Sequence, residues 1–212
     1  MTLAPNKQRI VLATVNQGKI IELRQMLQGM PCQLHGLDEF PDIPEAVEEG
    51  QTFQENARQK AQHYSQLLNL RVIADDSGLE VDALDKAPGI YSARFAGSTN
   101  AERSERDRAN IDKVLQLLSG IEQSRRTARF RCCLCLSYPE KILIETEGIL
   151  EGRITDAPRG ESGFGYDPVF LIPEFGKTAA ELSAEEKNQV SHRGRAVRKL
   201  ADQLIPLLTS NR

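Results

Sequence analysis

The chain has 212 residues, 40% of them hydrophobic and 27% charged, which is ordinary for a globular protein with a core of its own. Its formal net charge of -3 at pH 7 argues against diffuse binding to nucleic acid or to anionic membranes, because proteins that bind polyanions in this way are usually basic. No apolar run reaches the roughly 18 residues of a membrane-spanning helix, and Met1–Arg9 lacks the apolar stretch of a signal peptide, so we expect a cytoplasmic protein.

The first third of the chain alternates between strand and helix patterns. The apolar run Ile10–Thr14 predicts a strand, and a short polar loop follows it. Apolar residues then recur at helical spacing, at Ile20, Leu23 and Leu27. After a loop rich in proline and acidic residues, Thr52 and Glu55 have the spacing of a capping box, which predicts the start of a second helix.

Lys60 and Asn56 border the apolar face of this second helix. That face is traced by Phe53, Ala57, Ala61, Tyr64 and Leu68. A lysine directed toward a core or a cleft is costly unless it meets an anion. Alternatively, its stem packs against the helix while its ammonium reaches water. Spacing alone leaves both interpretations open.

The middle of the chain predicts further strands and a helix. Arg71–Ala74 reads as a strand that leads into Asp75-Asp76-Ser77-Gly78, and the alternation after this segment, at Leu79, Val81 and Ala83, predicts another short strand. The range 101–118 predicts a helix, because its last two turns place apolar residues on one stripe.

The second half of the chain predicts a long hairpin and a final helix. Alternation between residues 130 and 138, then Ile142–Ile154 across a Pro-Glu-Lys turn, favours two antiparallel strands. Three of the four cysteines lie in the first of them, where we expect small buried thiols. Ser183–Glu186 has capping-box spacing, and the last helix is expected to end near Leu208. Interleaved helices and strands with at least one hairpin predict an α/β fold on a mixed sheet with flanking helices.

Two segments carry residues suited to a nucleoside triphosphate and a metal ion. The loop Thr14–Lys19 lies between a strand and a helix, whose free N–H groups and positive dipole suit a polyphosphate, although an ordinary surface lysine is also compatible. The adjacent carboxylates Asp75 and Asp76 suit magnesium, with one acidic residue of Glu48-Glu49 as a second ligand. A simple Asp-Asp-Ser-Gly turn is the alternative.

A third segment offers groups for a base. Residues 160–168 are rich in glycine, which permits close approach of a ligand to the backbone. Phe164 or Tyr166 provides a flat face and Asp167 can read a base edge, whereas a structural turn is the competing interpretation. Histidine is scarce, and His35, His63 and His192 lack the spacing of metal ligands, so a zinc site is not expected.

In their order, these segments resemble the inosine triphosphate pyrophosphatase family over nearly the whole chain. The matching stretches are 12–19, 52–57, 74–79, 87–94, 163–168 and 191–194. The resemblance implies an elongated mixed sheet with flanking helices, one two-lobed domain over residues 1–212 with a central cleft, and a homodimer. It also implies magnesium-dependent hydrolysis of ITP, dITP and XTP to monophosphate and pyrophosphate, which removes deaminated purines from the nucleotide pool.

The resemblance further implies a role for individual residues. Asp76 is expected to bind magnesium and accept a proton, with Glu48 as the second metal ligand, although Glu49 is adjacent. The expected substrate-binding residues are Thr14, Val15, Asn16, Gln17, Gly18, Lys19, Lys60, Ser77, Phe164, Gly165, Tyr166, Asp167, Lys187, His192 and Arg193. Val15 departs from the family pattern, which commonly has a small residue there, and its β-branched side chain restricts the loop.

Three other functions compete with this one. A pyrophosphatase of related fold would act on dTTP or UTP, but the Ser191–Gly194 segment and the Phe164–Asp167 loop argue against it. A nucleotide-binding regulator without turnover would not need the carboxylates at Glu48, Asp75 and Asp76. An aspartyl-phosphate phosphatase would need a DxD motif, whose spacing the Asp75–Asp76 pair lacks.

Overall fold

The computed structural model describes residues 8–97 and 102–210. Residue 101, the predicted start of the third helix, and most of the N-terminal stretch considered for a signal peptide lie outside these ranges. The described α-helices are α1 (Gln17–Met26), α2 (Phe53–Leu68), α3 (Arg103–Leu117), α4 (Ala184–Val190) and α5 (His192–Thr209). The described strands are β1 (Gln8–Ala13), β2 (Cys32–Gly36), β3 (Arg71–Val81), β4 (Thr127–Tyr138), β5 (Lys141–Ile154), β6 (Phe170–Ile172) and β7 (Lys177–Thr178).

The strands form one mixed sheet in the order β2-β1-β3-β4-β5-β6-β7. β1 is parallel to both β2 and β3, whereas β6 is antiparallel to β5 and to β7. Two residues separate β4 from β5, and so short a connection joins antiparallel neighbours. The predicted α/β fold on a mixed sheet is therefore confirmed. No helix in the described ranges is long and apolar enough to cross a membrane.

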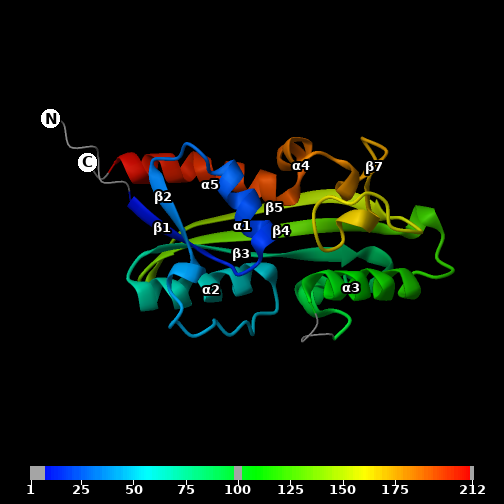
Figure 1. Cartoon of the computed structure of the whole chain (residues 1–212), viewed down its shortest axis with the longest axis horizontal. Coiled ribbons are helices and arrows are strands. Elements are labelled where there is room, and N and C mark those ends of the chain that lie inside the picture. The colour runs from blue at the N-terminus through cyan, green and yellow to red at the C-terminus, as the bar shows by residue number, and fades with distance from the viewer. Residues whose placement is uncertain (1–7, 98–101, 211–212) are drawn as a thin grey trace. The chain divides into compact units, whose positions relative to one another are not determined.

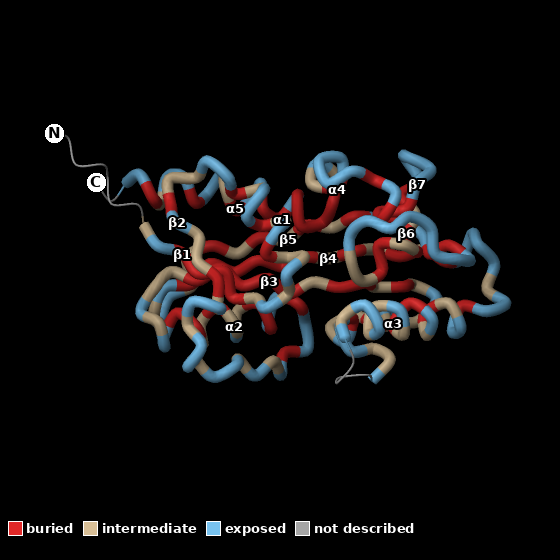
Figure 2. Tube along the Cα trace, in the orientation of Figure 1, coloured by how far each residue is buried: buried red, intermediate tan, exposed pale blue. Residues whose placement is uncertain are grey.

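The chain divides into two compact units, and three strands contribute residues to both. Unit 1 contains the described residues of 1–76, 133–147 and 196–212, and unit 2 those of 77–132 and 148–195. The division cuts β3 between Asp76 and Ser77. In both units buried residues run along the strands, and the outer faces of the helices are exposed (Figure 2).

Unit 1 is built around β1, whose residues from Ile10 to Ala13 are at most 1% exposed. In Figure 1, α2 lies on one side of its strands and α1 and α5 lie on the other. This arrangement follows from right-handed crossovers, because the chain moves from β1 to β2 in one direction and returns past β1 to β3 in the other. α1 buries Ile20 and Leu23, as its apolar spacing predicts.

Unit 2 has its own apolar core beneath α3. Leu79 and Val81 from β3, Ile111 and Val114 from α3, and Phe170 from β6 belong to this core. The rings of Phe130 and Phe170 have centroids 4.2 Å apart, close to the range of favourable aromatic pairs. The core holds the start of α3 beside the loop that precedes β6.

Three local predictions need correction. β2 is an additional parallel strand at the sheet edge, where its polar alternating residues gave no apolar run. β3 runs without a turn through Asp75–Gly78 and ends at Val81, before Ala83. The Thr52 hydroxyl does cap α2 by accepting from the Glu55 N–H, but the Glu55 carboxylate accepts from the Gln51 N–H, so the capping box is not reciprocal.

All four cysteines are free and buried, as predicted for small core thiols. Cys132 and Cys135 have C-x-x-C spacing, but residues three apart on a strand point to opposite faces. Burial raises the pKa of the Cys135 thiol to about 12, with Glu145 adding to the effect. A buried thiol with so high a pKa is chemically inert near neutral pH.

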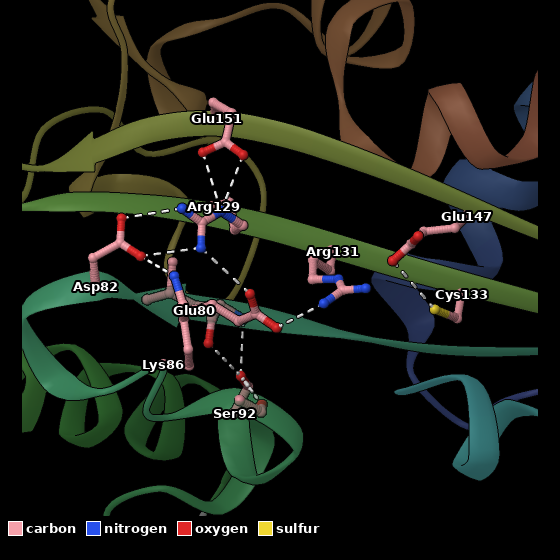
Figure 3. Close-up of polar contacts among 11 residues, drawn as sticks. Glu80, Asp82, Lys86, Ser92, Arg129, Arg131, Cys133, Glu147 and Glu151 are labelled. Atoms are coloured by element: carbon pink, nitrogen blue, oxygen red, sulfur yellow. Dashed lines mark hydrogen bonds and ion pairs between the residues drawn. The ribbon is translucent and has the colours of Figure 1, made fainter. Parts of the chain in front are cut away.

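A network of charged side chains covers part of the sheet in unit 2 (Figure 3). Arg129 on β4 donates to both carboxylate oxygens of Glu151 on β5 and to those of Asp82, which follows β3. Asp82 also accepts from Thr127 over 2.6 Å and pairs with Lys86. Cross-strand pairs of this kind stabilise the sheet without providing a reactive group.

Candidate active site

The register of β1 and β3 places the predicted phosphate loop beside the acidic pair. Ala13 at the end of β1 is the partner of Ala74, the residue before Asp75. The strand order β2-β1-β3 reverses direction beside β1, and ligands of open α/β sheets bind at the carboxyl ends of strands at such a point. Unit 1 therefore has the arrangement of a ligand site at this edge.

The loop between β1 and α1 is fixed by its own side chains. Thr14 Oγ1 accepts from the Asn16 N–H over 3.2 Å, and Asn16 Oδ1 accepts from the Lys19 N–H over 3.1 Å. The first helical residues, Gln17 and Gly18, have N–H groups that lack intrahelical partners. These groups and the helix dipole favour an anion. Val15, the departure from the family pattern, is 73% exposed and leaves both caps intact.

Lys19 and Lys60 approach the acidic pair from two different helices. Lys19 Nζ on α1 lies 2.6 Å from Asp75 Oδ1, and the Asp75 side chain is fully buried. Lys60 Nζ on α2 donates to the Asp75 carbonyl over 3.0 Å and to Asp76 Oδ1 over 3.2 Å. Lys60 thus meets anions rather than water, which decides between the two interpretations left open by its spacing.

The Lys60 ammonium also bridges two carboxylates. It lies 3.2 Å from Glu48 Oε1 as well as 3.2 Å from Asp76 Oδ1. Glu49 is exposed and its N–H donates to Gln59, so Glu48 is the acidic residue of this pair that faces Asp76. The second oxygen of Asp76 accepts from Asn56 over 3.2 Å, and Asn56 is buried.

The pKa values of Asp76 and Lys60 are both raised, for different reasons. Burial raises the pKa of the Asp76 carboxyl, and Glu48 adds to this effect, whereas Lys60 and Lys19 oppose it. Burial alone would lower the pKa of Lys60, but Asp76, Glu48 and Asp75 together outweigh it and raise the pKa. Glu48, Asp75 and Asp76 therefore share one polar cluster with the ammonium groups of Lys19 and Lys60, and we call it the acidic cluster.

The acidic cluster has the donor chemistry of a magnesium site that is completed by substrate. In the described ranges, no three His, Cys, Asp or Glu side chains are grouped closely enough to hold a metal ion by themselves. Magnesium commonly takes one or two carboxylates, with phosphate oxygens and water as its other ligands. Glu48 and Asp76 already share one cation, the Lys60 ammonium, so both oxygens are directed toward a common positive charge.

In unit 2, the loop before β6 is fastened by Asp167. Asp167 Oδ2 accepts from the Phe164 N–H over 2.8 Å and from Lys187 Nζ over 2.6 Å. Gly163 has a φ of +81°, and a Cβ there would lie 2.1 Å from Asp167 Oδ2. Glycine is therefore required at position 163 both for its backbone conformation and for the space that the carboxylate needs.

The Phe164 ring is surrounded by three cationic side chains. The distances to its centroid are 4.8 Å from Arg103 Cζ, 4.9 Å from Lys187 Nζ and 5.6 Å from Arg193 Cζ. Arg193 is 1% exposed, and its Nη2 donates to Ser77 Oγ over 2.7 Å. We call Phe164 and these cations the aromatic cluster.

Two predicted substrate residues lie in the core of unit 2. Tyr166 is 5% exposed, and its hydroxyl donates to the Ser92 carbonyl over 2.9 Å. His192 is 6% exposed and stacks on the Phe130 ring, with centroids 4.8 Å apart. Of the aromatic groups in this part of the chain, Phe164 is therefore the better placed to receive a base.

Three residues in or beside these clusters were not predicted as site residues. Asn56 is directed at Asp76, and the sequence placed it on the border of the α2 face and in the stretch 52–57 without giving it a role. Asp107 accepts from the Gly165 N–H over 2.9 Å, and Arg103 lies over Phe164. Both belong to α3, whose mixed charges gave no reason to connect it with a loop almost 60 residues later.

Residues 10–203 match the model of the Ham1 family. A dITP/XTP pyrophosphatase from Bacillus cereus is 48% identical over 201 residues, which cover 94% of this chain and 96% of the relative. A dITP/XTP pyrophosphatase from Exiguobacterium is 49% identical over 200 residues, covering 94% and 98%.

Solved structures agree with this similarity. The Staphylococcus aureus Ham1 protein superposes with a TM-score of 0.81 at 42% identity, covering 93% of this chain and 98% of that protein. A HAM1 protein from Coxiella burnetii gives a TM-score of 0.83 at 40% identity, with the same coverage. The family match, over residues 10–203, extends over both units and includes all the residues of the acidic and aromatic clusters.

Proposed function

Because the chain belongs to the Ham1 family, we propose that it hydrolyses the triphosphates of deaminated purines, ITP, dITP and XTP, to monophosphate and pyrophosphate with the help of magnesium. The acidic cluster is the observation that carries this proposal. It combines two ammonium groups for a polyphosphate with two carboxylates, Glu48 and Asp76, that share one cation. A protein that only bound nucleotide would have no use for this carboxylate pair.

The acidic cluster is assigned to the triphosphate. Lys19 and the start of α1 offer a full charge and free N–H groups, and Lys60 offers a second charge. Magnesium, held by Glu48 and Asp76, would neutralise charge on the phosphoryl group and on the departing pyrophosphate. The oxygen chemistry of the two carboxylates and the cation they already share support this metal.

Asp76 is assigned as the proton acceptor. Water attacks the α-phosphorus, the bond between that phosphorus and the bridging oxygen to the β-phosphate breaks, and pyrophosphate leaves with the electron pair. The proton of the attacking water passes to the Asp76 carboxylate. Asn56 and Lys60 hold the two oxygens of this carboxylate and so fix its orientation.

The aromatic cluster is assigned to the purine. Phe164 offers a face for stacking, and Lys187 and Arg193 offer donors for an oxygen on C6 of the base. The amino group of adenine would leave such a buried donor unpaired, and sites of this kind discriminate strongly. Ser77, which accepts from Arg193, is the residue that follows Asp76 in the chain.

Three further predictions remain proposals. We expect residues 1–212 to act as one domain, in a homodimer, in the cytoplasm. Light scattering coupled to size-exclusion chromatography tests the homodimer. A mass near 23.6 kDa, that of one chain, would contradict it.

A substrate panel tests the proposed reaction. The purified protein is incubated with magnesium and, separately, with ITP, dITP, XTP, ATP, GTP and dTTP, and pyrophosphate and orthophosphate are measured apart. We expect pyrophosphate from the first three substrates and little from the others, with no activity after chelation of the metal. Activity confined to pyrimidines would overturn the assignment of the base, and nucleotide binding without hydrolysis would favour a regulator.

A further inference from the structure

The guanidinium of Arg103 lies over the Phe164 ring. Its Cζ lies 4.8 Å from the ring centroid, within the 4.5–7 Å range of paired aromatic rings. A guanidinium group is planar and delocalised, so it stacks on aromatic faces as a base does. The Phe164 ring therefore has a flat, cationic partner from the chain itself.

The three cations of the aromatic cluster differ in how firmly they are held. Lys187 is buried and bonded to Asp167 over 2.6 Å, and Arg193 is buried and bonded to Ser77 over 2.7 Å. Arg103 has a side chain that is 33% exposed, and its Nε lies 3.7 Å from Asp107, too far for a hydrogen bond. Arg103 is therefore the cation that moves with the least loss of interactions.

The backbone of Arg103 is nevertheless held close to the Phe164 ring. Its Cα belongs to the first residue of α3, and Asp107 in the next turn accepts from the Gly165 N–H over 2.9 Å. Asn110, a turn further on, accepts from the Ala96 N–H over 2.7 Å. The helix start is thus tied to the residue that follows Phe164, while the long Arg103 side chain retains rotational freedom.

We infer that Arg103 is a substrate-binding residue that covers the base: the purine enters between the Phe164 ring and the Arg103 guanidinium, which then stacks on the outer face of the base. This inference rests on the proposed function, since it requires Phe164 to be the stacking partner. A cation stacked on the base favours a ring that carries negative charge. Xanthine has a second carbonyl and loses a proton more readily than hypoxanthine, so XTP gains more from Arg103 than ITP does.

Binding of monophosphates by calorimetry measures this contribution without turnover. Arg103→Gln is compared with wild type for IMP, XMP and ribose 5-phosphate, the last of which has no base. We expect IMP affinity to fall about 3- to 30-fold, the range that a partly desolvated cation–π contact supports. XMP affinity should fall further, and ribose 5-phosphate affinity should not change. In kinetics, KM for ITP should rise while kcat stays within about twofold.

Two variants serve as controls. Arg108→Gln removes the same charge from an exposed position of the same helix and should behave as wild type. Arg103→Lys keeps the positive charge but lacks the planar guanidinium group. Compared with Arg103→Gln, it should therefore restore part of the XMP affinity and little of the stacking. An equal loss for IMP and ribose 5-phosphate would show that Arg103 only supports the loop, and would overturn the inference.

Phe164→Leu separates this inference from the proposed function. If Phe164→Leu weakens IMP binding and Arg103→Gln does not, the base site stands and the inference about Arg103 falls. If neither substitution changes the affinity for IMP, the assignment of the base to the aromatic cluster falls as well. The expected result is that both variants lose IMP affinity and that the double variant loses less than the sum of the two effects.

Discussion

Arg193 donates a hydrogen bond of 2.7 Å to the hydroxyl of Ser77, and both side chains belong to unit 2. Arg193 is 1% exposed, so its buried charge is stabilised by such hydrogen bonds and by the Phe164 ring, whose centroid is 5.6 Å from Arg193 Cζ. A buried guanidinium with fixed partners is pre-organised as a donor, which is the property that discrimination by a hydrogen bond requires.

Arg193→Ala is therefore expected to lose selectivity as well as rate. Without the donor, the oxygen on C6 has no special advantage over an amino group, so the ITP-to-ATP ratio of kcat/KM should fall by roughly tenfold or more. Steady-state kinetics with both substrates measure the ratio, and thermal unfolding shows whether the variant is folded. An unchanged ratio in a folded variant would remove Arg193 from base recognition.

Asp76→Asn is expected to abolish turnover while ITP binding largely survives. The amide keeps the shape of the side chain but neither accepts the water proton nor offers a charged metal ligand, so the rate should fall by about 10²–10³-fold or more. Calorimetry measures ITP binding and a pyrophosphate assay measures turnover. Asp85→Asn, at an exposed position, is the matched control. Near-normal turnover by Asp76→Asn would disprove its assignment as metal ligand and base.

Lys60→Met should increase the affinity for a free divalent cation. The ammonium now lies 3.2 Å from both Glu48 and Asp76, so a metal ion entering between them must compete with it. Paramagnetic resonance of Mn²⁺, without nucleotide, measures this affinity, while turnover should fall because the triphosphate loses a cation. Lys141→Met, at an exposed position, is the control. Weaker Mn²⁺ binding by Lys60→Met would contradict the competition.

Gly163→Ala should damage the base site more than an equivalent substitution elsewhere. Its Cβ would lie 2.1 Å from Asp167 Oδ2, which also holds Lys187, so the KM for ITP should rise markedly. Gly120→Ala is a close control, because its φ of +79° carries similar strain while nothing lies within 4 Å of the new Cβ. Equal effects of the two substitutions on KM would refute the role of the Asp167 contact.

Asp82→Asn should lower stability at neutral pH but not in acid. Hydrogen bonds from Lys86, Thr127 and Arg129 lower the pKa of Asp82 (Figure 3). A carboxyl with a lowered pKa contributes stability above its unfolded pKa of about 3.9, and this contribution is lost as the pH falls through the folded value. Urea unfolding should therefore show a loss of about 1 kcal/mol at pH 7 that shrinks below about pH 4. If Asp82→Asn lost the same stability at pH 7 as below about pH 4, the contribution would not come from the charge of Asp82.

The sequence predicted the acidic cluster well because local patterns determine it. The loop Thr14–Lys19 follows the apolar strand β1, and Asp75 and Asp76 follow the apolar residues Val72–Ala74 within the neighbouring β3, so parallel pairing brings them together. Lys60 was ambiguous, because its helical position shows which face it borders but not what lies opposite. Its partners Glu48 and Asp76 became clear only from the packing of α2.

The aromatic cluster was only partly predictable. The glycine-rich loop indicated a ligand site, but its candidate Tyr166, and His192 near the last helix, are buried by packing that no local pattern contains. Arg103, by contrast, lies over Phe164 but was not predicted, because it is one of many charged residues at the start of α3. Its position over Phe164 depends on how α3 packs on the core of unit 2, and a contact of this sequence separation leaves no periodic signal.

Because the division between the units falls within β3, β4 and β5, neither unit is a continuous stretch of chain. Unit 1 needs three segments and unit 2 needs two, so no simple truncation isolates either one. Mixing two separately expressed fragments would have to rebuild shared strands before either core formed. We therefore expect the two units to melt in a single cooperative transition, and a truncated form of this enzyme to be insoluble rather than half active.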